Sequence, residues 1–204
     1  LAGWTIYVDY DNDGVKDAGE PSAVTAADGS YTITGVNPGT WRVKEVAQAG
    51  WTQSYPALGY HEETFTSGAA LTGNDFGNWT PASKSGVKFN DKGDANGLKD
   101  AGETGMSGWV IRIYADSNAD GLLNQAEYNV GPTATTTTAA TIGAYAFTGL
   151  NPGKYIVVEV MQDKNSTPYY QSAPSTGVLD SGLNTGTEKL GPNGYAITLV
   201  SGQV

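Results

Sequence analysis

The chain has 204 residues, no cysteine and a formal net charge of −10 at pH 7. The absence of cysteine excludes disulfide bridges and thiol chemistry, and an acidic chain without a basic stripe argues against nucleic acid or an anionic membrane as a partner. No apolar run is long enough to cross a bilayer or to serve as a secretory leader, so we expect no membrane insertion.

The first predicted element is a strand in which Trp4, Ile6 and Val8 take alternate positions, as in a half-buried strand. A twelve-residue acidic loop follows, with oxygen ligands at positions 1, 3, 5, 7, 9 and 12 and a glycine at position 6. These ligands are Asp9, Asp11, Asp13, Val15 (through its carbonyl), Asp17 and Glu20. This spacing is typical of loops that surround Ca²⁺ with six to eight hard oxygens. Pro21 discourages a following helix, so we predict a calcium loop between strands.

The chain is a tandem duplication. Residues 30–46 recur 114 positions later as residues 144–160, and both segments contain an Asn-Pro-Gly turn between strand-like runs. The second copy carries a threonine-rich insertion near residues 133–141 and a longer insertion between residues 172 and 194. Neither copy shows a sustained helical period, so the pattern predicts an all-β chain of two tandem β-sandwich domains.

We place these domains at residues 1–79 and 86–204, joined by a proline-containing linker at residues 80–85. When the copies are aligned, the first lacks its first strand and first calcium loop, and the second lacks its last strand. We therefore expect a piece of a longer protein. The open strand edges should be covered by neighbouring repeats or subunits arranged head to tail.

A degenerate calcium loop begins the second copy. Its candidate ligands are Asp91, Asp94, Asn96, Leu98 (through its carbonyl), Asp100 and Glu103. Counting back from Glu103 places Lys92 at position 1 and leaves Asp91 one residue out of register. A bulge could bring Asp91 into the site, or the site could be weak or empty, and the sequence leaves both readings open.

The second complete loop follows a strand from Trp109 to Tyr114, and we predict that it too lies between strands. Its candidate ligands are Asp116, Asn118, Asp120, Leu122 (through its carbonyl), Asn124 and Glu127. Twelve of the 21 acidic residues lie in the three loops, five, four and three in chain order. Folding has to overcome their mutual repulsion, and bound Ca²⁺ would remove it.

Three motifs carry a resemblance to a known family: GVKFNDKGDANGLKDAGETGMSGWVIRIY, GAYAFTGLNPGKYIVVEV and GNDFGNW. They resemble the calcium-binding B-type repeat domains of serine-aspartate-repeat surface adhesins, within the collagen-adhesin B-type (prealbumin-like) superfamily. The resemblance implies immunoglobulin-like or prealbumin-like sandwiches that form a calcium-stiffened stalk, spacer or fibre at the cell surface. Host or matrix ligands would then be bound by other domains of the parent protein.

In related domains a glutamate assists an isopeptide bond between lysine and asparagine. Here the resemblance implies Glu45 or Glu159 as the acid and Lys88 as the amine, with Asn74 or Asn78 as the acceptor. Against the bond, Val87 and Phe89 alternate with Lys88 and are expected to take the core face, and each copy lacks one partner. The simpler reading is that both glutamates hydrogen-bond locally.

No combination of residues predicts an enzyme, since one histidine and no cysteine cannot supply a duplicated nucleophile site. The alternative function is a carbohydrate- or ligand-binding module of a secreted protein, with Trp51, Tyr169 and Tyr170 as a candidate surface patch. Trp4 and Trp109 are expected to be core residues. A dockerin-like calcium module is a further alternative, suggested by DSNADGLLN, but it would need helices that the sequence does not predict.

Overall fold

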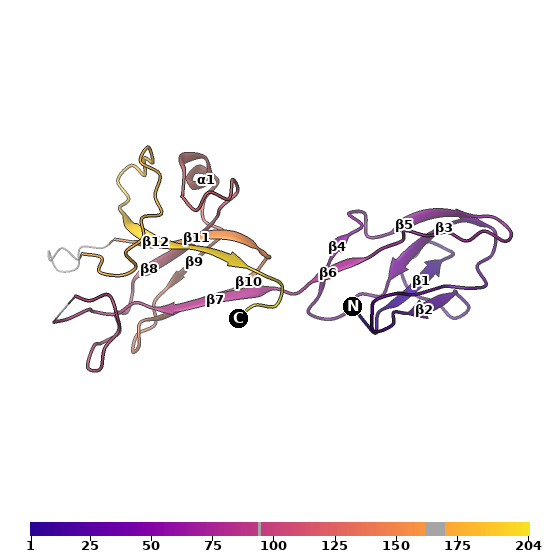
Figure 1. The fold of residues 1–204 in the computed structure, drawn as a ribbon, viewed down its shortest axis with the longest axis horizontal. Coiled ribbons are helices and arrows are strands. Elements are labelled where there is room, and N and C mark those ends of the chain that lie inside the picture. The colour runs from indigo at the N-terminus through magenta and orange to yellow at the C-terminus, as the bar shows by residue number, and fades with distance from the viewer. Residues whose placement is uncertain (94, 162–169) are drawn as a thin grey trace. The chain divides into compact units, whose positions relative to one another are not determined.

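The computed structural model describes residues 1–93, 95–161 and 170–204. Within these residues it has twelve strands and one short helix, which confirms an essentially all-β chain. Its contacts divide the chain into two compact units, unit 1 from Leu1 to Thr80 and unit 2 from Pro81 to Val204 (Figure 1). None of the described helical residues forms a span with the length and apolar character needed to cross a membrane.

Unit 1 contains a four-stranded antiparallel sheet in the order β2-β1-β3-β5 and a two-stranded sheet of β4 and β6. Its strands are β1 (Thr5–Asp9), β2 (Ser22–Val24), β3 (Gly39–Glu45), β4 (Thr52–Tyr55), β5 (His61–Phe65) and β6 (Gly77–Trp79). Trp4, Ile6, Val8 and Val43 form its core, as their alternation predicts. Tyr7, on the other face of β1, is also buried, with 1% of its surface exposed.

Unit 2 contains a four-stranded sheet in the order β12-β11-β8-β9 and a two-stranded sheet of β10 and β7. Its elements are β7 (Ala82–Val87), β8 (Val110–Ala115), α1 (Gln125–Val130), β9 (Ala134–Thr137), β10 (Ala144–Leu150), β11 (Gly153–Val160) and β12 (Leu190–Leu199). The threonine-rich segment supplies β9, which pairs with β8 in the way that β2 pairs with β1. The residues added in this copy therefore lie between Glu127 and β9.

The linker is shorter than predicted, because β7 begins inside residues 80–85. Ala82 pairs with Leu150 and Lys84 pairs with Phe147, so these residues belong to the sheet of unit 2. Ala82 is also buried in the core of that unit. The proline that suggested a linker precedes β7 directly, where a missing N–H does not interrupt a ladder.

Residues 30–36 correspond by repeat to β10 but form no strand. In unit 2, β10 pairs with β7, and no described strand of unit 1 takes the place of β7. Backbone N–H and C=O groups need partners to form a sheet, so the same strand-like sequence becomes a strand in only one copy.

The four-stranded sheet of unit 2 is covered on both faces. Alternate residues of β11 enter different cores, because side chains alternate across a strand. Tyr155 and Val157 pack with Phe147 and other residues of one cluster. Ile156 and Val158 enter a second cluster. That second cluster is completed by Tyr114, Leu123, Val178 and Leu190, so the longer insertion forms a layer over the face that points away from β7 and β10.

Helix α1 was not predicted. It begins at Gln125, inside the second complete loop, and Asn124 caps it by accepting hydrogen bonds from the N–H groups of Ala126 and Glu127. Glu127 reaches back to the Asn124 N–H, which completes a capping box. The interpretation that both complete loops lie between strands is therefore wrong for this loop.

Candidate calcium sites

The first loop starts at Asp9, the last residue of β1. Asp9 is buried, with none of its surface exposed. Asn12 and Gly14 then adopt positive φ values of 62° and 82°, which fold the chain back over the Asp9 carboxylate. The Gly14 N–H donates to Asp9 Oδ2 at 3.0 Å. The sharp turn that the glycine at position 6 predicts is therefore present.

Three carboxylates converge in this loop. Ligand oxygens of Asp9, Asp11 and Asp13 lie within 4.8 Å of one another. Ligands of one Ca²⁺ stand about 2.3–2.6 Å from the ion, so oxygens at this separation can share it. Glu20, at position 12, is 8% exposed and accepts hydrogen bonds from the Tyr10 and Asp17 N–H groups.

Electrostatics favours a cation at this loop. Asp9 Oδ1 is buried and has no hydrogen-bond partner in the described residues, and Lys44 Nζ lies 3.8 Å from the other oxygen. The charge of Asp13, followed by burial and the other acids, raises the pKa of Asp17. Burial, with the charge of Asp9 second, raises the pKa of Tyr7 to about 12. A buried carboxylate oxygen without a donor fits the hard cation that the loop spacing predicts.

The degenerate loop uses Asp91 in the position-1 role. Its Oδ2 accepts the Gly97 N–H at 2.8 Å, as Asp9 Oδ2 accepts that of Gly14. Asp91 therefore takes this role although one more residue separates it from the glycine. Asp91 Oδ1 is likewise buried without a described partner. Glu103 bonds to the N–H groups of Lys92 and Asp100. Asp94 lies outside the described residues.

The remaining candidates of this loop form internal hydrogen bonds. Asn96 Oδ1 accepts the Leu98 N–H, and Asn96 Nδ2 donates to Asp100 Oδ2 at 2.8 Å. Burial pushes the pKa of Asp91 up, but hydrogen bonds from Gly97 and Ser172 outweigh it, and the pKa lies below its usual value. The lysine at position 1 does not prevent an acid from occupying the centre of the loop.

The second complete loop repeats the same hydrogen bonds with fewer charges. Asp116 accepts the Gly121 N–H, and Asp120 Oδ1 accepts that of Leu122. Glu127 accepts bonds from Ser117 and from the Asn124 N–H. Asn118 Nδ2 donates to Asp120 Oδ2 at 2.7 Å. At this position the first loop has Asp11, so the second loop has an amide where the first has a carboxylate.

One template therefore recurs in all three loops. The acid before the turn accepts the N–H of the glycine at position 6, and the closing glutamate accepts the N–H groups after position 1 and at position 9. In each loop the residue two positions before the glycine at position 6 also has a positive φ. These residues are Asn12, Ala95 and Ala119. The hydrogen bonds thus recur in all three loops, whereas the close approach of three acidic groups is found, among the described residues, at Asp9, Asp11 and Asp13.

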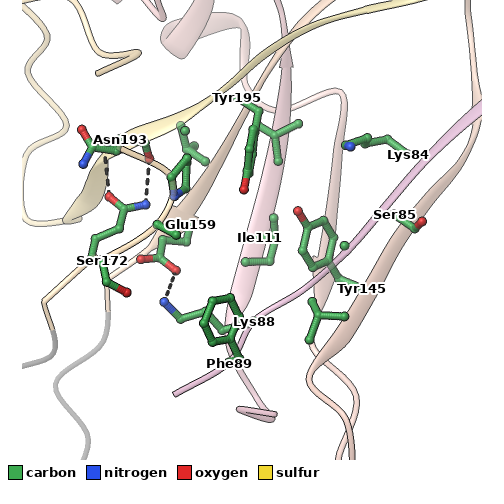
Figure 2. Close-up of a pocket in the computed structure, with 18 residues that line it drawn as sticks. Lys84, Ser85, Lys88, Phe89, Ile111, Tyr145, Glu159, Ser172, Asn193 and Tyr195 are labelled. Atoms are coloured by element: carbon green, nitrogen blue, oxygen red, sulfur yellow. Dashed lines mark hydrogen bonds and ion pairs between the residues drawn. The ribbon is translucent and has the colours of Figure 1, made fainter. Parts of the chain in front are cut away.

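The two glutamates of the repeat have different partners. Glu45 Oε1 accepts the Asn78 side-chain amide at 2.7 Å. Glu159 Oε2 instead pairs with Lys88 Nζ at 2.7 Å (Figure 2). Lys88 Nζ also lies over the Trp109 ring, 4.7 Å from its centroid. Lys88 thus faces inward while Val87 is 43% exposed, so the expected orientation of this strand was wrong. Burial raises the pKa of Glu45, and the Asn78 hydrogen bond opposes that rise.

The components of an isopeptide are divided between the units. Unit 1 holds the acid and the asparagines, including Asn74, and unit 2 holds the acid and the amine. The isopeptide implied by the family resemblance stays a prediction, and the local hydrogen bond expected for Glu45 is present.

The aromatic residues differ in burial, and the aromatic patch stays a prediction. Trp4 and Trp109 are buried, as expected. Trp51 packs edge-on against Trp4 with 5.7 Å between ring centroids and is partly buried. Tyr170 is 88% exposed, and Tyr169 lies outside the described residues.

A family model described as the SdrD B-like domain matches residues 86–202, more than half of the chain. The chain belongs to the SdrD B-like domain family. It is 29% identical over 171 residues to serine-aspartate repeat-containing protein D of Staphylococcus aureus, strains Newman and MW2. The match takes in 79% of this SdrD B-like chain but only 12% of the length of those relatives. The resemblance to serine-aspartate-repeat adhesins is thereby confirmed at the level of the family.

Two solved structures are also similar over the whole chain. The TIE protein of Bacillus anthracis gives a TM-score of 0.34 at 17% identity, with 29% of its own chain covered. GBS52, the minor pilin of Streptococcus agalactiae, gives a TM-score of 0.30 at 14% identity, with 79% covered.

Proposed function

We propose that this chain is a calcium-stabilised structural module of an extracellular bacterial surface protein, acting as a stalk, spacer or fibre element. Membership of the SdrD B-like family supports the surface and structural parts of the proposal. In this proposal the two compact units are tandem β-sandwich domains, joined in series to neighbouring repeats. The parent protein would bind host or matrix ligands through its other domains.

The observation that carries the calcium part is the first loop. Asp9, Asp11 and Asp13 converge, and a buried oxygen of Asp9 has no described donor. We assign the ligand roles of this site to the six oxygen donors that the spacing predicts. They are Asp9, Asp11, Asp13, Val15 (carbonyl), Asp17 and Glu20. The ion would neutralise a cluster whose mutual repulsion already raises the pKa of Asp17.

The shared hydrogen-bond template extends the proposal to the other two loops. Their described donors are Asp91, Asn96, Leu98 (carbonyl), Asp100 and Glu103 in one, and Asp116, Asn118, Asp120, Leu122 (carbonyl), Asn124 and Glu127 in the other. Each of these two sets has three described carboxylates, against five in the first loop, and fewer charged ligands weaken calcium affinity. We therefore expect the first loop to bind most tightly.

Isothermal titration of calcium into chelator-stripped chain tests the proposal, with thermal unfolding measured on the same samples. We expect saturable uptake and a higher melting temperature with calcium, because a ligand of the native state stabilises it by mass action. Asp13→Ala should remove the tightest site and leave the weaker ones. Absence of uptake would refute the calcium site, and uptake without a change in melting temperature would refute its structural role.

A further inference from the structure

The turn of the first loop lies against a lysine that belongs to a different strand. Lys44, on β3, has its Nζ atom 2.8 Å from the point where a Cβ atom at Gly14 would stand, so the missing side chain lets the ammonium approach the turn. At the matching glycine of the second complete loop, Gly121, the nearest neighbour of such an atom is the methyl group of Ala196, at 3.5 Å.

Lys44 is directed at the acids of the loop. It lies opposite Tyr7 in the ladder of β1 and β3, and its Nζ is 3.8 Å from Asp9 Oδ2. Its side chain is 23% exposed, and that of Asp9 is fully buried. Arg42, two residues earlier on the same face of β3, lies instead over the Tyr60 ring, 4.2 Å from its centroid. Charges that are largely buried are screened by salt less than exposed ones.

The two oxygens of the Asp9 carboxylate have different surroundings. Oδ2 accepts the Gly14 N–H at 3.0 Å and faces Lys44. Oδ1 is buried without a described partner, and ligand oxygens of Asp11 and Asp13 lie within 4.8 Å of one of Asp9. A cation held by Oδ1 and the ammonium at Oδ2 can therefore use opposite sides of one carboxylate. Lys44 then acts on the ion through its charge rather than by occupying its place.

This charge has opposite effects on the empty and the occupied loop. In the empty loop it offsets part of the repulsion among five acids. An ion about 2.3–2.6 Å from an Asp9 oxygen would lie closer to Lys44 Nζ than the Debye length of about 10 Å at 0.1 M salt. The two cations then repel each other. Lys44 thus lowers the free energy of the empty loop and raises that of the occupied one.

The second complete loop has no lysine at the matching place. Residues 30–46 recur as residues 144–160, so Lys44 corresponds to Val158, which is buried in the second core of unit 2. Lys154 does approach this loop, but it is exposed and donates to the Ala119 carbonyl, at 3.5 Å. The second loop therefore serves as an internal reference without an ammonium at its turn.

We propose that Lys44, from outside the loop, sets the calcium affinity of the first site. Its ammonium substitutes for part of the calcium charge while the loop is empty and opposes the ion when it binds. The inference rests on the proposed calcium function and adds a residue that tunes it. The loop consequently fills at a higher calcium concentration than its five carboxylates alone would require, and it keeps more of its shape when calcium is absent.

The test is a calcium titration of the full chain followed by NMR, with the Gly14 amide reporting the first loop and the Gly121 amide the second. Lys44→Met keeps most of the stem and removes the charge. It should strengthen binding at Gly14 about three- to tenfold, as expected for a nearby positive charge acting on a divalent ion. Binding at Gly121 should not change. Unchanged or weaker binding at Gly14 would overturn the proposal.

Two matched variants separate this charge from other effects. Lys16→Met removes an exposed lysine of the same loop, and its affinity should change less than about twofold because exposed charges are screened. Lys44→Arg keeps the charge, and its affinity should stay near that of the parent chain. Equal strengthening by Lys16→Met and Lys44→Met, or the same strengthening by Lys44→Arg, would overturn the proposal.

The empty loop gives a second readout that needs no calcium. In chelator, hydrogen exchange in residues 9–20 should be faster in Lys44→Met than in the parent chain, because the acids have lost their counter-charge, and should not change in Lys16→Met. A variant that binds calcium more tightly without faster exchange in chelator would contradict the role of Lys44 in the empty loop.

Chemical labelling of the parent chain tests the ion pair without any substitution. Calcium should increase acetylation of Lys44, since the ion repels the ammonium from Asp9, and should leave acetylation of Lys84 in unit 2 unchanged. Unchanged labelling of Lys44 in a chain whose Gly14 amide responds to calcium would count against this inference alone. No response of Gly14 to calcium in any variant would count against the proposed calcium function, and the exchange in chelator would still test the ion pair.

Discussion

The first and second complete loops share a hydrogen-bond template but differ in what holds them in shape. Position 8 of the first loop is Lys16, which is exposed, and position 8 of the second is Leu123, which is fully buried. The Leu123 backbone also bonds to Val178 and Asp180 of the longer insertion. The second loop is thus attached to a core, whereas the first is exposed over most of its length.

The difference extends to the strand behind each loop. On the outer face of β3 lie Arg42 and Lys44, and Lys44 approaches Asp9. The matching residues of β11 are Ile156 and Val158, which enter the second core of unit 2. The second loop is therefore held by apolar burial and a capped helix. For the first loop we expect stability to depend on neutralising its charges instead.

The largest expected effect comes from Leu123→Ala. Truncating a fully buried leucine costs about 2–5 kcal/mol, so the free energy of unfolding of unit 2 should fall by that order. Lys16→Ala, at the matching position of unit 1, should change stability by less than about 0.5 kcal/mol. Chemical denaturation of both variants measures this difference, and similar losses would show that the second loop is not anchored by its core.

Removal of calcium should affect the units unequally. At a concentration one hundred times the dissociation constant, a bound ligand contributes about 2.7 kcal/mol. We expect hydrogen exchange in residues 9–20 to accelerate strongly on chelation, and exchange in residues 116–127 to change less. Mass spectrometry of the exchanged peptides resolves the two loops. Equal acceleration would mean that calcium is as necessary to the second loop as to the first.

Asp9→Asn should affect the stability of unit 1 in opposite directions without and with calcium. In chelator the substitution removes a buried charge from a repulsive cluster, so unit 1 should be as stable as the parent chain or more stable. With calcium it removes a ligand, so the melting temperature should rise less on calcium addition than in the parent. Thermal unfolding in both conditions tests this, and destabilisation in chelator would contradict the charge argument.

The smallest effect is expected for Asn124→Ala. Loss of an N-cap costs about 0.5–2 kcal/mol, and Asn124 caps α1 through the Ala126 and Glu127 N–H groups. Asp17→Ala is the matched control, because the first loop has no helix to cap. In chelator only the Asn124 variant should lose stability, measured by denaturation. Equal responses would mean that the cap contributes nothing to the second loop.

Much of the candidate site was predictable because it is local. In the first loop the spacing of acids and glycine determines that Asp9, Asp11 and Asp13 converge, and the alternation of Trp4, Ile6 and Val8 identified a core face correctly. The capping pair Asn124 and Glu127 was a signal for α1 that went unused, because both residues were assigned to calcium. The apolar residues on both faces of β11 similarly indicated a second core.

Other features depended on contacts between distant parts of the chain. The spacing alone left open whether Asp91 or Lys92 takes position 1, because Asp91 is one residue out of register. The structure shows that Asp91 accepts the Gly97 N–H. Lys88 faces inward because Glu159, far along the chain, and the Trp109 ring receive its charge. The strand-like residues 30–36 have no partner strand and so form none. The sequence by itself determined the loop spacing and the β-rich class, because these follow from neighbouring residues. Only the tertiary structure decided which buried charges found partners, since pairing requires groups that the chain order keeps apart.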